Sequence, residues 1–272
     1  MSAVARPVTV GVDGSAPAMQ AVRWAAVEAE MLGAALEVVA VGDREAADAA
    51  MEGLAVARAA AAVPVGATTH RGDPVRVLVA ESARSRLLVL GNRGLGALRG
   101  LLANSVSGPV AARAHCPVAV VRGPEHHRAD LPVVLGVDGT PAGEAAIGYA
   151  FEAADRRAVP LVAVHVWRDE LDDPEWASAF VDVDPAEQER ELLSERLAGW
   201  SARFPDVQLS RVLDDEQPVR ALVARSLQAS LLVVGSRGKI RAPGRWGSVA
   251  GALLHEAQCP VVVVRPAPVA AR

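Results

Sequence analysis

The amino-acid sequence predicts an α/β fold built as two tandem doubly wound domains, each a five-stranded parallel sheet flanked by helices. Three observations lead to this prediction. Short runs of Val and Leu alternate with longer Ala-rich amphipathic stretches, which is typical of βαβ units. The apolar runs lack polar alternation, as strands buried on both faces do. The whole pattern then occurs a second time along the chain.

The internal repeat is the strongest feature of the sequence. Three segments of the first half recur in the second: PVTVGVDGS (7–15) as PVVLGVDGT (132–140), LLVLGNRG (87–94) as LLVVGSRG (231–238), and HCPVAVVR (115–122) as QCPVVVVR (258–265). Residue numbers differ by 125 between Asp13 and Asp138 but by 144 between Gly91 and Gly235. The second copy therefore carries 19 additional residues (144 − 125), which we expect near Trp167–Pro185.

The domain boundaries follow from the repeat. A chain of 272 residues is long enough for two α/β domains of about 130–140 residues each. We predict a first domain over residues 1–123, a polar linker over 124–131 and a second domain over 132–272. His126 and His127 lie in this linker without a Cys or acidic cluster at ligand spacing, so we interpret them as solvated rather than as metal ligands.

The individual elements are expected as follows. Strands of the first repeat are expected at 8–12, 36–41, 67–70, 87–90 and 117–121, and helices at 16–31, 45–62, 74–82 and 105–114. Strands of the second repeat are expected at 133–137, 161–166, 208–212, 231–234 and 260–264. Ser15 and Pro17 suit the start of the first helix. Ligands of such sheets bind beyond the carboxyl ends of the strands, where strand order reverses.

Composition excludes several classes of protein. The net charge of −4, with acidic and basic residues mixed along the chain, disfavours a basic nucleic-acid-binding face. No apolar run approaches the roughly 18–20 residues of a membrane span. The N-terminus lacks an apolar signal region, which predicts a cytoplasmic protein.

Cys116 and Cys259 both precede a proline, and we interpret them as small buried thiols. The tryptophans of the second copy are interpreted as core or interface residues, at Trp167, Trp176, Trp200 and Trp246.

Two loops carry the candidate chemistry of the first repeat. In Val12–Ser15, Asp13 can accept hydrogen bonds or help to hold a metal, Gly14 permits a tight turn and Ser15 can cap the next helix. The second loop runs from Gly91-Asn-Arg-Gly94 through nine residues to Asn104-Ser105-Val106-Ser107. Glycines allow backbone N–H groups to approach an anion, and a helix that starts at Asn104-Ser105 offers free N–H donors. Together they predict a phosphate cradle.

Other phosphate-binding motifs do not match. A P-loop fails because Gly238-Lys239 is followed by Ile240, and residue 233 is Val. The dinucleotide fingerprint fails because Gly94 and Gly96 are followed by Gly100 rather than by a glycine at position 99. The glycine loop also follows the fourth strand, not the first.

The motifs resemble those of the universal stress protein family over nearly all of both repeats. The shared features are an Asp after the first strand, the G-x2-G-x9-[G]-[S/T] loop after the fourth, and CPVxVV as the fifth. The resemblance implies ATP as the ligand, alone or with Mg²⁺. It assigns nucleotide contacts in the first repeat to Asp13, Gly14, Ser15, Val41, Gly91, Arg93, Gly94, Asn104, Ser105 and Val106. In the second repeat it assigns them to Asp138, Gly139, Thr140, Val166, Gly235, Gly238, Gly247, Ser248 and Val249.

Both repeats depart from the family pattern. Asn104 stands where the family prefers Gly, although Asn tolerates left-handed conformations and caps helices. The second repeat has eight residues, not nine, between Gly238 and Gly247, including Pro243 and Trp246. It also has Asp215-Glu216-Gln217-Pro218 in place of the turn around Gly72. We therefore expect the first repeat to be the principal ATP site and the second to bind more weakly or not at all.

Three functions fit these residues. The favoured one is an ATP-binding regulatory or signalling protein with at most slow hydrolysis, because no Ser-His-Asp order, paired carboxylates or HExxH motif supplies a catalytic base. A tandem scaffold that has lost nucleotide binding is the first alternative. An ATP-using enzyme of the related adenine nucleotide α-hydrolase-like superfamily is the second, but it would carry SGGxDS or HIGH motifs. By the resemblance, the apolar last strands predict pairing of the two repeats, and chains that form homodimers are a further possibility.

Overall fold

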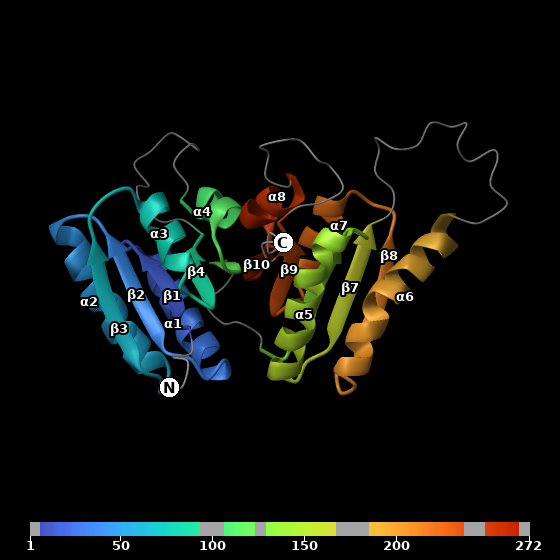
Figure 1. The fold of residues 1–272 in the computed structure, drawn as a ribbon, viewed down its shortest axis with the longest axis horizontal. Helices are drawn as coiled ribbons and strands as arrows, with labels where there is room; N and C mark the ends of the chain where they lie inside the picture. Colours follow the sequence, from blue (N-terminus) through green and yellow to red (C-terminus); the bar gives the residue numbers. More distant parts are fainter. Residues whose placement is uncertain (1–5, 93–105, 123–128, 167–184, 237–247, 267–272) are drawn as a thin grey trace, which may run out of the picture. The chain divides into compact units, whose positions relative to one another are not determined.

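The computed structural model describes residues 6–92, 106–122, 129–166, 185–236 and 248–266. The chain divides into two compact units, residues 1–125 and 126–272, which we call unit 1 and unit 2. Figure 1 shows both as strands flanked by helices.

Unit 1 is a parallel α/β sheet in the order β3-β2-β1-β4-β5. Its elements are β1 (Val8–Val12), α1 (Ala16–Met31), β2 (Leu36–Val41), α2 (Arg44–Ala60), β3 (Val65–His70), α3 (Pro74–Ser82), β4 (Leu87–Gly91), α4 (Ser107–Arg113) and β5 (Val118–Val121). The strand order reverses between β1 and β4, which is the place where sheets of this class bind ligands.

Unit 2 repeats this topology in the order β8-β7-β6-β9-β10, also parallel. Its elements are β6 (Val133–Val137), a 3₁₀ turn (Pro141–Gly143), α5 (Glu144–Arg157), β7 (Leu161–Val166), α6 (Pro185–Arg203), β8 (Leu209–Asp214), α7 (Pro218–Ser226), β9 (Leu231–Gly235), α8 (Ser248–Glu256) and β10 (Val261–Val264). The predicted fold class is therefore confirmed.

Helices cover both faces of the sheet in unit 1. On one face, Gly53 of α2 lies against Val38 and Val22, and α1 contacts α2. On the other face, Gly11 of β1 lies against Leu78 of α3, and α3 contacts α4. The strands between these layers are almost fully buried, which explains why their sequences show no polar alternation.

Most predicted bounds agree with the structure, and the exceptions have local causes. β3 begins at Val65, earlier than predicted, because Val65 pairs with Leu36. β8 extends to Asp214, later than predicted, because Asp214 pairs with Val166. α2 ends at Ala60 because Ala61 is extended, with φ −154° and ψ 154°. β5 and β10 begin one residue after a proline, which has no N–H to donate.

Candidate functional site

A small cleft opens at the carboxyl edge of the unit 1 sheet. It lies at the ends of β1, β2 and β4, where strand order reverses. Its described lining residues are Gly11, Val12, Asp13, Ala18, Val39, Val41, Leu78, Leu90, Gly91, Val106 and Ser107. Four of these, Asp13, Val41, Gly91 and Val106, are among the contacts implied by the family resemblance.

The turn after β1 is built around the Asp13 carboxylate. Asp13 Oδ1 accepts hydrogen bonds from the Ser15 backbone N–H at 3.1 Å and from the Ser15 hydroxyl at 2.6 Å. The Ser15 hydroxyl oxygen in turn accepts from the Ala18 N–H at 3.3 Å, so Ser15 caps α1 as predicted. Gly14 has φ +79°, a conformation that favours glycine. The turn thus places one carboxylate at the rim of the cleft.

Most of the cleft wall is aliphatic, and some of its residues were not predicted from the sequence. Val39 and Leu78 are buried residues of β2 and α3, and Ser107 is 6% exposed at the start of α4. Val39 was within reach of prediction, because residues two apart in a strand share a face with each other and Val41 was assigned. Leu78 had no such signal, because its place depends on how α3 crosses the sheet.

Gly91 lies close to the first turn of α1, which by itself favours glycine at this position. A Cβ atom on Gly91 would lie 2.8 Å from the Pro17 carbonyl oxygen and 3.1 Å from the Ala18 nitrogen. The first turn of α1 therefore already occupies the space beside Gly91. A side chain here would displace α1 whether or not an anion approaches, so Gly91→Val is not a specific test of ligand binding.

The helix after the glycine loop begins later than predicted. α4 starts at Ser107, not at residue 105, and ends at Arg113 because Ala114 is extended (φ −56°, ψ 153°). Val106 already has helical dihedral angles, and its carbonyl accepts from the Val110 N–H at 3.1 Å. Four predicted contacts, Arg93, Gly94, Asn104 and Ser105, lie outside the described residues.

Unit 2 keeps the turn but changes the helix start. Asp138 Oδ1 accepts from the Thr140 N–H and the Thr140 hydroxyl, each at 2.9 Å, and Gly139 has φ +71°. However, Thr140 makes no capping bond, and the 3₁₀ turn Pro141–Gly143 delays α5 to Glu144. The serine at the start of α4 has no counterpart, because Ala250 takes its place in the repeat.

The remaining unit 2 predictions are only partly described. Val166 and Gly235 end β7 and β9, and Val249 follows the first residue of α8. Gly238 and Gly247 lie outside the described residues, as does the side chain of Ser248. The insertion over residues 167–184, with Trp167 and Trp176, and the loop residue Trp246 are also outside them.

Charged pairs beside the third strand of each unit have opposite polarity. In unit 1, His70 Nε2 lies 3.5 Å from Glu81 Oε1, and Glu81 Oε2 accepts from Arg84 Nε at 2.7 Å. In unit 2, Arg225 Nη2 donates to Asp214 Oδ2 at 3.1 Å. The basic residue lies on the strand in unit 1 and on the helix in unit 2. The two repeats therefore both pair a basic with an acidic residue here, but at exchanged positions.

Both cysteines are free and buried, as predicted. Desolvation by burial raises the pKa of Cys116 and of Cys259 to about 12, so both thiols stay neutral at physiological pH. Across the described ranges, no group of three or more His, Cys, Asp or Glu residues is placed to hold a metal ion. None of the helices in that part of the chain is long and apolar enough to cross a membrane.

Comparison with known proteins places this geometry in a family. The profile of the universal stress protein family matches residues 5–63, 43–122 and 131–265. A universal stress protein of Mycobacterium tuberculosis is 39% identical over 292 residues, covering 95% of this chain and 96% of the relative. One of Mycolicibacterium smegmatis is 37% identical, covering 97% and 99%.

A crystal structure of a universal stress protein from Archaeoglobus fulgidus has a similar fold. Its TM-score is 0.71 at 17% identity, and the match covers 96% of this chain and 98% of that one. The likeness concerns the fold, whereas the profile and the mycobacterial relatives concern the sequence itself over almost its whole length. The chain belongs to the universal stress protein family.

Proposed function

We propose that unit 1 binds ATP in the cleft between the ends of β1 and β4, and that the protein has a regulatory or signalling role in the cytoplasm. The observation that carries this proposal is the position of the cleft at the reversal of strand order, with one carboxylate at the rim and aliphatic walls. Clefts of this kind take a ligand with an apolar body and a few polar groups.

The lining residues suit different parts of ATP. Val39, Val41 and Leu78 offer an apolar surface for a base, and Asp13 offers an acceptor for hydroxyl groups of a ribose. Asp13 is the one ionisable residue among the described lining residues. A triphosphate therefore needs its charge balanced by other groups, for which Mg²⁺ is our proposal, and Asp13 is the described lining residue that would help to hold it.

Slow hydrolysis follows from the same residues. Asp13 Oδ1 already accepts two hydrogen bonds from Ser15, and the described lining contains no His, Cys, Lys or Tyr. A general base must reach the proton that it removes, and the described residues of the wall supply no second candidate. We expect no turnover near the ordinary enzymatic range of about 1 s⁻¹ or more.

For unit 2 we propose weak nucleotide binding or none. Its first helix begins later, and Ala250 cannot offer the hydroxyl that Ser107 offers in unit 1. These differences favour a scaffolding role for unit 2. The alternative of a scaffold that has lost nucleotide binding would then apply to unit 2 alone. Pairing of the two repeats, and of two chains, remains a prediction.

A matched pair of substitutions tests the proposed site. Val41→Trp places a large ring at the wall of the unit 1 cleft, and Val166→Trp does the same at the corresponding strand end of unit 2. Calorimetric titration with ATP should show at least about a hundredfold loss of affinity for Val41→Trp and little change for Val166→Trp. Wild-type affinity in a folded Val41→Trp variant would overturn the proposal.

A further inference from the structure

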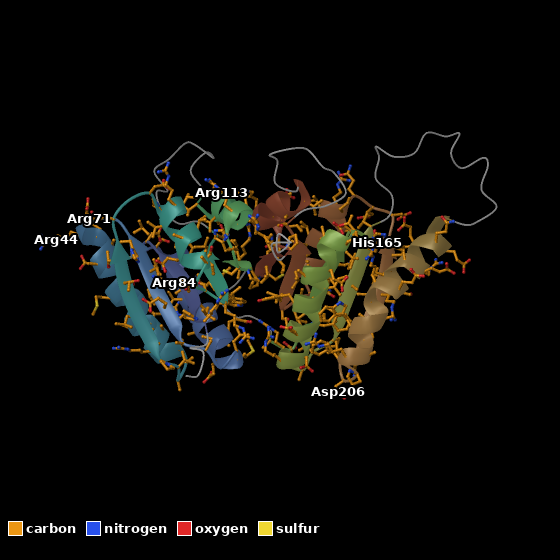
Figure 2. The ribbon with its side chains drawn as sticks, viewed as in Figure 1. Arg44, Arg71, Arg84, Arg113, His165 and Asp206 are labelled. Carbon is orange, nitrogen blue, oxygen red and sulfur yellow. The ribbon has the colours of Figure 1, made fainter. Side chains whose placement is uncertain are left out.

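A buried histidine of unit 2 has no counterpart in unit 1. His165 is 1% exposed, lies on β7 and pairs in register with Val137. The corresponding register position in unit 1 pairs Ala40 with Val12. Figure 2 labels His165 near the carboxyl end of β7. An imidazole therefore occupies the place of a methyl group at the edge where each unit carries its aspartate turn.

Both ring nitrogens of His165 face oxygen atoms. His165 Nδ1 lies 2.8 Å from the carbonyl oxygen of Val137, the last residue of β6. His165 Nε2 lies 2.7 Å from Oε2 of Glu189 on α6. The imidazole thus joins the end of β6 to α6, and the Val137 carbonyl directly precedes Asp138.

A count of protons shows what these two contacts require. A backbone carbonyl can only accept a hydrogen bond, and so can an ionised carboxylate, whereas a neutral imidazole has one N–H. Two hydrogen bonds therefore require one proton more than a neutral imidazole and a carboxylate possess. That proton is on the second ring nitrogen or on Glu189. Without it, one lone pair of the ring faces a carboxylate oxygen.

We propose that His165 and Glu189 form a proton-dependent latch that holds α6 to the end of β6 in unit 2, with no equivalent in unit 1. With the proton bound, both hydrogen bonds form to an almost fully buried imidazole. When the proton leaves to solvent, the contact between Nε2 and Oε2 becomes repulsive. Glu189, whose side chain is 24% exposed, can then turn toward water.

Neighbouring charges have other partners or are exposed. Asp138 accepts from Thr140, Asp214 pairs with Arg225, and Glu144 accepts from Trp200 Nε1. The remaining charged residues near this end of α6 are exposed, at Glu187, Arg190 and Glu191. Among the described residues of the neighbouring elements β6, β8, α5, α6 and α7, Glu189 is the charged residue that makes a hydrogen bond with the His165 ring.

The direction of the pH dependence follows from the count. If the latched state binds one more proton than the opened state, raising the pH favours opening, and the opening constant rises by up to about tenfold per pH unit. Unit 1 carries Ala40 at the position of His165, so we expect no matching dependence in α2. The latch does not depend on nucleotide binding.

The Glu189→Gln substitution should keep both hydrogen bonds of the latch while removing their dependence on the additional proton. A glutamine amide can donate to a neutral Nε2 while Nδ1–H donates to Val137, so both hydrogen bonds persist without the additional proton. Glu187→Gln, on the same helix but exposed, is the matched control. Hydrogen exchange of the amides around residues 187–193, corrected for intrinsic rates, reports the opening of α6.

The measurement runs from about pH 5 to about pH 8, where an unperturbed imidazole titrates. We expect the opening of α6 to increase with pH in the wild type and in Glu187→Gln, and to be flat in Glu189→Gln. Proton-detected ¹⁵N spectra of the His165 ring, acquired on the wild type, give a second reading that needs no variant. Equal pH slopes in the wild type and Glu189→Gln, or a neutral ring beside an ionised Glu189 throughout, would overturn the proposal.

Discussion

The two units share one topology but fill the equivalent helix layer with different side chains. In unit 1, the contact of α2 with the sheet depends on small residues, because a Cβ atom on Gly53 would lie 2.9 Å from Val38 Cγ1. In unit 2, Phe151 of α5 stacks with Trp200 and Phe204 of α6 at centroid distances of 6.4 and 6.0 Å. Arg203 lies over the Trp200 ring at 5.4 Å.

This difference shows which features the fold demands. Strand order, the Asp turn and the glycine with positive φ recur in both units, whereas core residues, ion-pair polarity and helix starts do not. Interiors accept different side chains if volume and patterning are kept. The residues that differ, including Ser107 against Ala250 and Ala40 against His165, are therefore where we expect the functions of the two units to separate.

The largest expected effect on stability comes from truncating Trp200, which stacks with Phe151 and Phe204 in unit 2. Trp200→Ala should destabilise unit 2 by about 3 kcal/mol, the lower end of the range for Trp→Ala in cores, because Trp200 is only half-buried. Unit-resolved hydrogen exchange should show increased opening of α5 and α6 and little change in unit 1. Leu227→Ala, at a residue 65% exposed, is the control. Equal losses in both units would contradict the contrast in packing.

Gly148 sharpens the same contrast. A Cβ atom on Gly148 would lie 2.8 Å from Trp200 Cζ2, so Gly148→Ala should cost about 1–2 kcal/mol, as overpacking does. In the Trp200→Ala background the clash disappears, and the better helix propensity of Ala should make the change neutral or stabilising by up to about 1 kcal/mol. Denaturant unfolding of the four proteins of this cycle measures the coupling. Additive effects would show that the two residues do not share a contact.

The smallest expected stability difference compares the two helix starts. Ser15→Ala removes a capping bond and should cost about 1 kcal/mol. Thr140→Ala should cost only a few tenths of a kcal/mol, because Thr140 makes no capping bond and its hydroxyl contacts a partly exposed carboxylate. Thermal unfolding of both variants provides the comparison. A larger loss for Thr140→Ala would mean that the 3₁₀ start depends on its hydroxyl.

Local patterns were sufficient to predict the fold. The bounds of β1, α1, β2, α3, β6 and β7 agree with the structure, because apolar runs and cap residues are read over a few neighbouring positions. Residues that act across the fold were harder to predict. The contact between Trp200 and Phe151, and the pair His165–Glu189, join segments far apart in the sequence. Each depends on the angle between helix and sheet, which no short pattern encodes.

The site shows the same division. Asp13 and Val41 line the cleft at strand ends that the sequence pattern predicts, whereas Leu78 reaches the cleft only through the packing of α3. Gly91 lines the cleft, and its close approach to Pro17 of α1 was not predicted because it depends on a neighbouring element. A glycine after a strand indicates a close approach without saying of what.

The number of ATP molecules bound per chain is the sharpest test of the proposal that unit 1 binds nucleotide and unit 2 binds it weakly or not at all. Calorimetric titration of the whole chain, with and without Mg²⁺, should give a stoichiometry nearer one than two, and the Val41→Trp variant should remove that binding event. Two equivalent ATP molecules per chain, or one that persists in Val41→Trp and is lost in Val166→Trp, would contradict the assignment of the ATP site to unit 1.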